Sequence, residues 1–289
     1  MLLRRSPACI ICRGAIILLV SGLAGATLVR LAPGFGVDEQ ALDPRLSAES
    51  LEALARQHAG ERNPLNFYVH FLGRLLRGDA GRSAVFGQPV GRLIRERAST
   101  TLRSVSGGLA LSWSAAVLLA VATVFSRRTT VVLGATAISG SLISIPSAVV
   151  ATLCLLLRLS PGIAIAAVVF PRIFPHAYEQ LRSSLAAPHV VMAHARGLSG
   201  TRIFLFHVAP PTLMPMLALG GVSIPLAFGA SIPIEALADS PGIGQLTWRA
   251  ALGRDLPVLV GITLLLATIT IVANVAADII VVKIGRRAI

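Results

Sequence analysis

The stretch HARGLSGTRIFLFHVAPPTLMPM, from His194 to Met216, is a short polar interruption between two long apolar runs. It holds two Arg, two His, two Gly and three Pro within 23 residues, so it is both polar and rich in helix-breaking residues. Pro188, just upstream, is a residue type that starts helices, and Gly197 can end such a helix in the left-handed conformation. The pattern therefore predicts a short helix that stops at a glycine.

A second short helix follows from the same stretch. Ser199 is a suitable N-terminal cap for a helix from Gly200 to Ala209. Pro210 and Pro211 would close that helix, because proline lacks the N–H that a helix interior needs. We call residues 186–211 the elbow, and we expect it to be two short helices hinged at a glycine.

The composition of the whole chain indicates a membrane protein. Of 289 residues, 54% are hydrophobic and only 13% are charged, and the mean hydropathy is +0.77. A soluble domain of this length needs a more charged surface. The formal net charge is +13, but the basic residues lie between and beside apolar runs. We therefore expect lipid headgroups, and no nucleic acid, as their partners.

Six segments are long and apolar enough to predict membrane-crossing helices, since a span needs about 20 mostly apolar residues. For the first segment the alternative is a cleaved signal peptide that ends at the small residues 24–26, but its apolar character continues beyond them. Small residues in the third segment, Ser139 to Ser144, allow either close helix packing or a pore-lining face. The segments are Cys9–Leu31, Ser104–Phe125, Thr130–Leu157, Pro161–Leu181, Thr212–Ala236 and Pro257–Val282.

The distribution of basic residues predicts the orientation of these spans. One set of ends carries Arg4, Arg5, Arg13, Arg127, Arg128, Arg182, Arg196, Arg202, Lys283, Arg286 and Arg287. The opposite set of short loops carries only Arg158, Arg249 and Arg254. Because basic loops stay inside, we expect both termini in the cytoplasm. The regions are then 1–31 with the first span, an extracytoplasmic loop over 32–103, and a five-helix core over 104–289.

The extracytoplasmic loop contains two predicted helices. Pro64 is a good helix start, and apolar residues then recur on one face as far as Leu76. Pro89 opens a second amphipathic stretch, in which Val90 and Leu93 lie opposite several arginines. We expect this second helix to lie at the membrane interface just before the second span.

Two functions are open for the elbow on physical grounds. Ile203, Phe204 and Phe206 give it more apolar surface than a water-facing loop requires. Such a surface suits a groove on a cytoplasmic partner. Alternatively, these side chains bury themselves among lipid headgroups.

The chain carries no recognisable catalytic chemistry. A phosphate-binding loop needs a Gly-Lys-Ser/Thr sequence, but the only lysine, Lys283, follows Val282 and precedes Ile284. The six histidines are scattered without metal-ligand spacing. We therefore expect no enzyme activity, no cofactor and no metal site. Arg172, inside the fourth predicted span, is the one candidate for a functional charge within the membrane.

The elbow resembles the loop by which bacterial ABC importer permeases engage their ATPase, a pattern of Glu-Ala-Ala, three residues, Gly, nine residues and Ile-x-Leu-Pro. Gly197 takes the glycine position, Ala193 the last alanine and Pro210 the closing proline, whereas Val191 stands at the glutamate. The resemblance implies an ATPase-coupling role for Ala193, Ala195, Arg196, Gly197, Leu198, Ser199, Arg202, Ile203, Phe204, His207 and Pro210.

Other segments are similar to one branch of that superfamily, the first permease subunit of dipeptide, oligopeptide and nickel importers. The segment LLRGDAGRSAVFGQPVGRLIRERASTTL resembles the outer region of these subunits. The segments SPGIGQL (Ser240–Leu246) and GRDLPVLVG (Gly253–Gly261) resemble their connection into the last span. Asn274 and Asp278 match an Asn and an Asp near the end of that span. The resemblance extends over nearly the whole chain.

This resemblance implies an all-α polytopic fold with six transmembrane helices of the type I importer permease kind. It implies a multi-pass subunit of the bacterial inner membrane that forms half of a path for peptides or similar solutes. The implied partners are a second permease subunit, two ATP-binding subunits and an extracytoplasmic substrate-binding protein. The alternative is a self-contained secondary transporter or channel, which would show charges in mid-span and inverted repeats.

Overall fold

The computed structural model describes residues 7–31, 64–126 and 129–285, and within these ranges the regular secondary structure is helical. The first part of the predicted outer loop, residues 32–63, lies outside the described residues, and so do three pairs of basic residues used to predict the orientation. The described residues divide into two compact units. The first falls within 1–98 and 246–268, and the second within 99–245 and 269–289.

The first unit is built around α1 (Pro7–Leu31), α3 (Pro64–Leu75) and the beginning of α12 (Leu256–Gly285). Helix α3 begins at Pro64 as predicted, and its buried residues Tyr68 and Phe71 pack with Leu264 of α12. A Cβ on Gly22 of α1 would lie 2.5 Å from the Tyr68 hydroxyl oxygen, so the helices approach each other at a glycine.

Asp255 organises the connection into α12, within the segment GRDLPVLVG. Its buried carboxylate accepts a hydrogen bond from the Val258 N–H at 3.3 Å, which caps the first turn of α12. The other carboxylate oxygen accepts hydrogen bonds from the Ser83 hydroxyl and from the Val85 N–H. One side chain thus fixes both the start of α12 and the 83–85 loop.

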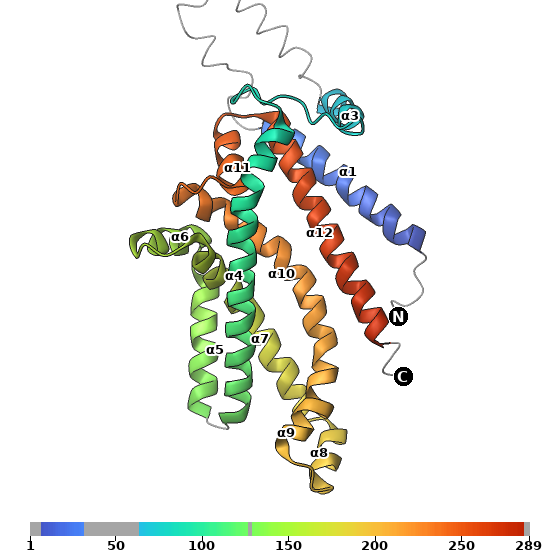
Figure 1. The fold of residues 1–289 in the computed structure, drawn as a ribbon, viewed down its shortest axis with the longest axis vertical. Coiled ribbons are helices and arrows are strands. Elements are labelled where there is room, and N and C mark those ends of the chain that lie inside the picture. Colours follow the sequence, from blue (N-terminus) through green and yellow to red (C-terminus); the bar gives the residue numbers. More distant parts are fainter. Residues whose placement is uncertain (1–6, 32–63, 127–128, 286–289) are drawn as a thin grey trace, which may run out of the picture. The chain divides into compact units, whose positions relative to one another are not determined.

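The second unit contains most of α4 (Val90–Ser126), then α5 (Thr129–Ser144), α6 (Ser147–Leu156), α7 (Pro161–Leu185) and α10 (Ala209–Leu237) (Figure 1). Helix α7 is central, because it packs against α5, α6 and α10. Its fully buried side chains are large, and they meet small residues of α10 and α4. The core comprises Ile165, Val169, Ile173 and Phe174 of α7, Ala227, Ala230 and Ile234 of α10, and Ala116 and Ala120 of α4.

Helix α7 remains helical through Pro171 and Pro175. Proline has no N–H, so Pro175 cannot donate to the carbonyl of Pro171, four residues earlier. The Ser139 hydroxyl of α5 donates to that carbonyl at 3.0 Å, in a fully buried bond. The small residues of α5 do not share one environment. Ser139 packs against α7, whereas Gly140 faces open space.

Two predicted elements are wrong. The third predicted segment, Thr130–Leu157, is not a single helix but two, α5 and α6, that meet at 100° and can still form one broken span. A proline disfavours the helical conformation of the residue before it, and α5 ends at Ser144, two residues before Pro146. The separate interfacial helix after Pro89 is the beginning of α4, which runs without a break from Val90 to Ser126.

Within the described residues, three helical stretches are long and apolar enough to cross a membrane: Val90–Ser126, Gly200–Leu237 and Leu256–Val281. The bent pair α5–α6 makes a fourth if it is one broken span. Helix α7 has 25 residues but carries charges and prolines, and the apolar part of α1 is the shorter stretch Gly14–Leu28. The all-helical membrane fold is confirmed, and the count of six spans stays a prediction.

Candidate functional site

The first half of the elbow is α8, which covers Pro188–Ala195 with Pro188 in its first turn, as predicted. Its last carbonyls are closed by two hydrogen bonds, from the Gly197 N–H to His194 at 2.9 Å and from the Leu198 N–H to Ala193 at 3.3 Å. This pair of bonds forms the Schellman motif, which requires a left-handed residue after the helix. Gly197 has φ +75°, so the predicted left-handed hinge is confirmed.

The second half of the elbow differs from the prediction. Ser199 occupies the N-cap position of α9 (Gly200–Ile203), but its side chain makes no capping hydrogen bond. A π-helical turn, Phe204–Val208, follows and leads directly into α10. The prediction that Pro210 and Pro211 close a short helix is wrong, since the chain is helical from Gly200 to Leu237.

The π-helical turn accommodates the two prolines. The Ala209 N–H donates to the carbonyl of Phe204, five residues back, so the turn is one residue wider than in an α-helix. Pro211 cannot donate to the carbonyl of His207. The His189 Nε2–H of α8 donates to it at 3.0 Å, and the two imidazole rings stack 6.5 Å apart. The donor missing from α10 is thus supplied by α8, and the two halves of the elbow are joined.

Burial divides the elbow side chains into an inner and an outer set. Val190, Ala193, Ile203 and Val208 are buried in the core of the second unit. The Phe204 ring packs edge-on against Phe125 of α4, with the ring centres 5.5 Å apart. We expected Ile203, Phe204 and Phe206 to supply the apolar contact surface. That prediction is wrong for Ile203, which is 1% exposed, and Phe204 is half-buried.

The exposed apolar side chains of the elbow are Val191 and Met192 on α8, and Leu205 and Phe206 on the π-helical turn. Sequence reasoning named Phe206 but missed Met192 and Leu205. For α8 the signal was present, because the buried pair at 190 and 193 has helical spacing and leaves 191 and 192 on the opposite face. Of the remaining predicted residues, Leu198 and His207 are half-buried, and Ala195, Arg196, Gly197, Ser199, Arg202 and Pro210 are exposed.

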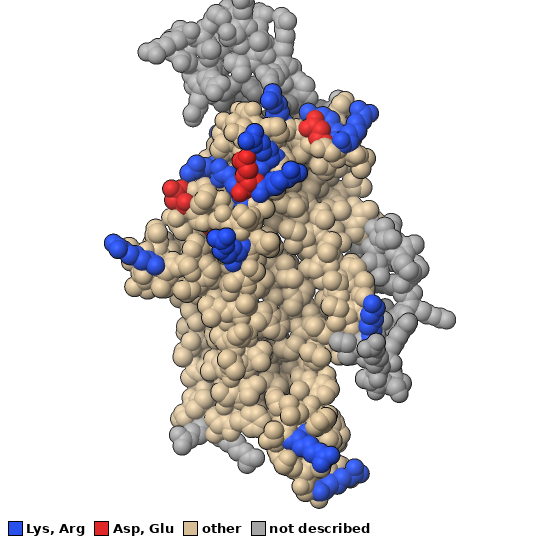
Figure 2. Space-filling view, in the orientation of Figure 1, with Lys and Arg blue, Asp and Glu red and all other residues tan. Residues whose placement is uncertain are grey.

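The elbow is cationic. Arg196 and Arg202 are exposed, and neither forms an ion pair within the described ranges. Figure 2 shows such cations at the end of the second unit that carries α8 and α9. The sequence has no Asp or Glu between Glu179 and Glu235, so the elbow offers no carboxylate of its own to neutralise them.

The opposite end of α10 holds a buried carboxylate. Glu235 accepts hydrogen bonds from the Thr101 hydroxyl at 3.0 Å and from the Gly244 N–H at 2.8 Å. The Thr101 hydroxyl oxygen in turn accepts from the Ile243 N–H at 2.7 Å. Added Cβ atoms on Gly242 and Gly244 would collide with Glu235 or with the α10 backbone. The segment SPGIGQL therefore fixes the start of α11 (Ile243–Leu252) against α10 and α4.

A family model described as Binding-protein-dependent transport system inner membrane component matches residues 108–289. This chain belongs to that family. The matched residues include the elbow, the buried Glu235 and the whole of α10. As a transport permease component, the chain is not expected to be an enzyme, and the sequence-based recognition of an importer permease is confirmed.

Curated relatives of this permease component are similar over nearly their whole length. The dipeptide transport system permease protein DppB of Lactococcus lactis is 25% identical over 269 residues, which are 85% of this chain and 87% of that protein. The oligopeptide transport system permease protein AppB of Bacillus subtilis is 23% identical over 91% and 92% of the two chains. The nickel import system permease protein NikB of Staphylococcus aureus is 25% identical over 92% and 86%.

Proposed function

We propose that this chain is the permease subunit of an ATP-driven importer and forms half of a translocation path for peptides or similar small solutes. The observation that carries the proposal is the elbow, in which a left-handed glycine ends the partly apolar helix α8 beside exposed arginines, at the end of a transport-family bundle. A second permease subunit, two ATP-binding subunits and an extracytoplasmic binding protein would complete the transporter. The dipeptide and oligopeptide transport functions of two relatives support peptides as the solute class.

In this proposal the chain has three regions, with both termini in the cytoplasm. Residues 1–31 contain an uncleaved first span, which is consistent with the packing of α1 against α3. Residues 32–103 form the outer region, and 104–289 form the permease core with the elbow on the cytoplasmic side. The bent pair α5–α6 would then count as one broken span, as found where helices are interrupted beside a transport path.

The elbow is suited to transmit a displacement into the membrane. The helical stretch from Gly200 to Leu237 is continuous, so a movement at its first turn carries α10 with it. The bond from His189 to the His207 carbonyl ties α8 to the same helix. ATPase closure would therefore move α8 and α10 together and switch the bundle between two packed states.

The exposed surface of the elbow indicates what the ATPase groove must offer. Val191 and Met192 require an apolar floor, and Arg196 and Arg202 favour carboxylates at the rim. Val191 stands where the family pattern has a glutamate, so we expect that this ATPase has no cation facing that position. Family membership favours this arrangement over a self-contained transporter or channel.

The substitution Met192→Asp tests the docking surface. Met192 is 57% exposed, so the protein should fold, but the new charge would enter an apolar groove. We expect normal membrane levels, reduced co-purification of the ATPase and loss of ATP hydrolysis stimulated by the loaded binding protein. Leu157→Asp is the matched control, because Leu157 is 69% exposed and follows α6, at a distance from the elbow. Equal ATPase retention in the two variants would contradict the proposal.

A further inference from the structure

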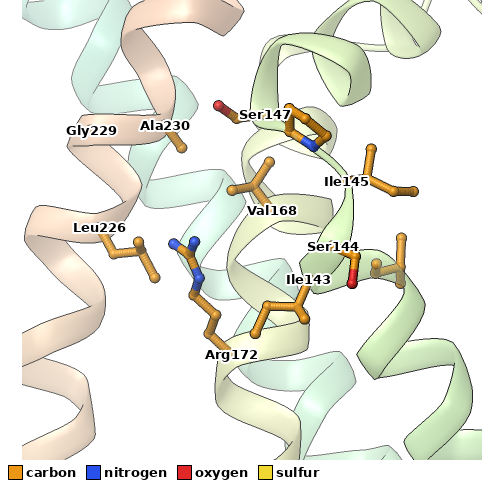
Figure 3. Close-up of a pocket in the computed structure, with 11 residues that line it drawn as sticks. Ile143, Ser144, Ile145, Ser147, Val168, Arg172, Leu226, Gly229 and Ala230 are labelled. Atoms are coloured by element: carbon orange, nitrogen blue, oxygen red, sulfur yellow. The ribbon is translucent and has the colours of Figure 1, made fainter.

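A cavity of about 320 Å³ lies in the second unit where α5 breaks into α6 (Figure 3). One wall is the α5–α6 junction, residues 142–147. The other walls are Val168 and Arg172 of α7, and Leu226, Gly229 and Ala230 of α10. This volume is at the lower end of the range for small-molecule sites.

Arg172 places a cation in this cavity. It lies near the middle of α7, and its guanidinium points between Leu226 and Val168 (Figure 3). In the described part of the chain, Arg172 has neither an ion-pair partner nor a side-chain hydrogen bond. If α7 is the fourth span, as the sequence predicts, an arginine at this position is costly, and such residues mark substrate or ion pathways.

The fold holds the α7 backbone beside this arginine. The preceding residue, Pro171, has its carbonyl fixed by the hydrogen bond from Ser139 of α5. Around Arg172, the stretch between the two helix prolines stays regular, so the base of its side chain has a defined direction. The guanidinium is therefore presented by a positioned helix instead of a loose loop.

The rest of the lining suits a solute that has an anionic group and an apolar part. None of the lining residues is acidic. Ser147 adds a hydroxyl group, and it is also the first residue of α6, whose N-terminus carries a partial positive charge. Val168, Leu226 and Ile143 supply apolar walls. One part of the cavity is therefore positively charged and the other walls are apolar. The lining contains no carboxylate that could bind a metal cation.

We propose that this cavity binds the carboxylate of the translocating solute and that Arg172 is the residue that holds it. The proposal rests on the importer function proposed above and narrows its solute class. A guanidinium forms two parallel hydrogen bonds with a carboxylate, and such a charge-assisted pair is stronger than a hydrogen bond between neutral groups. A free terminal carboxylate of a short peptide fits this chemistry, whereas a bare divalent cation is repelled.

The test is uptake by the complete transporter, reconstituted in liposomes with its companion permease, ATPases and binding protein. Alanyl-alanine is compared with its C-terminal amide in wild type, Arg172→Gln, Arg172→Lys and the control Arg158→Gln. We expect Arg172→Gln to lower the acid-over-amide uptake ratio by about 10- to 100-fold, the range for a hydrogen bond to a charged group. The lysine variant should lie between glutamine and wild type, and the control should match wild type. Because the same binding protein serves every variant, its own preference cancels in this comparison.

The possible outcomes distinguish a failure of the proposed carboxylate site from a failure of the proposed importer function. If Arg172→Gln lowers uptake of acid and amide in parallel, Arg172 pairs with a group of the protein, such as a carboxylate of the companion subunit, and the carboxylate site is refuted. If Arg172→Gln leaves both unchanged, the cavity is outside the solute path and the inference fails while the importer function stands. If wild type shows ATP hydrolysis without ATP-dependent uptake of either peptide, the proposed peptide import fails, and this inference fails with it.

Discussion

Gly197→Val is the perturbation that isolates the hinge of the elbow. A Cβ at Gly197 would meet nothing within 4 Å, so the substitution creates no clash. Its cost comes from φ +75° alone, a conformation that costs an L-residue about 1–2 kcal/mol, and β-branched residues tolerate it least. That cost lowers the population of the native hinge by roughly 5- to 30-fold relative to conformations in which residue 197 is no longer left-handed.

The relaxed hinge loses the two hydrogen bonds that close α8, at 2.9 and 3.3 Å. Val190 and Ala193 can remain packed against the core, so we expect wild-type amounts of folded protein in the membrane. ATPase retention should fall by up to the same 5- to 30-fold, if only the native hinge presents α8 correctly. Gly197→Asn should retain most of the binding, because asparagine tolerates the left-handed conformation.

The assay is purification of the solubilised complex through a tagged ATPase, followed by measurement of the permease-to-ATPase ratio and of stimulated ATP hydrolysis. Gly200→Val is the matched control, because its Cβ also meets open space and its φ is not left-handed. We expect the order wild type, Gly197→Asn, Gly197→Val. If Gly197→Val and Gly200→Val retain equal amounts of ATPase, the hinge does not set the presentation of α8, and our reasoning about the elbow is refuted.

Three further predictions concern stability, each measured as thermal unfolding of the purified protein in detergent. Ile203→Ala should cost about 2–5 kcal/mol because its side chain is fully buried, whereas Phe206→Ala should be nearly neutral, and equal losses would contradict the inner and outer sets. Ser139→Ala leaves a buried carbonyl of α7 without its donor and should cost about 1–3 kcal/mol; no loss would mean that α7 does not depend on this bond. Gly244→Ala should destabilise, since its Cβ would lie 2.5 Å from a backbone oxygen of α10, while Gly229→Ala meets open space and should not.

The sequence predicted most helices because their signals are local. Apolar length located α10 and α12, and Pro64 and Pro188 marked the first residues of α3 and α8. The left-handed glycine at position 197 followed from the polar break around it. Each of these features depends on residues within one or two helical turns, so sequence reasoning reaches them.

The effects of the other prolines depend on distant partners. Pro175 leaves α7 intact because Ser139, far away in sequence, supplies the missing donor. Pro146 breaks its helix by 100°. Pro211 is accommodated by a π-helical turn and by His189. Local sequence does not distinguish these three outcomes, because the donors to the α7 and α10 carbonyls come from α5 and α8, which only the fold brings near.

The candidate sites were only partly predictable for the same reason. The π-helical turn shifts the register after Ile203, so an α-helical period does not show which of the following side chains face outward. Arg172 was recognisable as an unusual charge, but its cavity is formed by α5, α6 and α10, which only the fold brings together. Glu235 gave no sequence signal of its own, and its role is visible only in its hydrogen bonds to Thr101 and Gly244.

The most direct test of the central claim is photocrosslinking from α8 in the assembled transporter. A benzophenone-bearing amino acid would replace Met192, which is 57% exposed, and in a matched control it would replace Leu118 of α4, which is 70% exposed. If the elbow docks on an ATPase, illumination should link the ATP-binding subunit to position 192 and not to position 118. An ATPase that co-purifies with the complex but forms no adduct at position 192 would contradict the account.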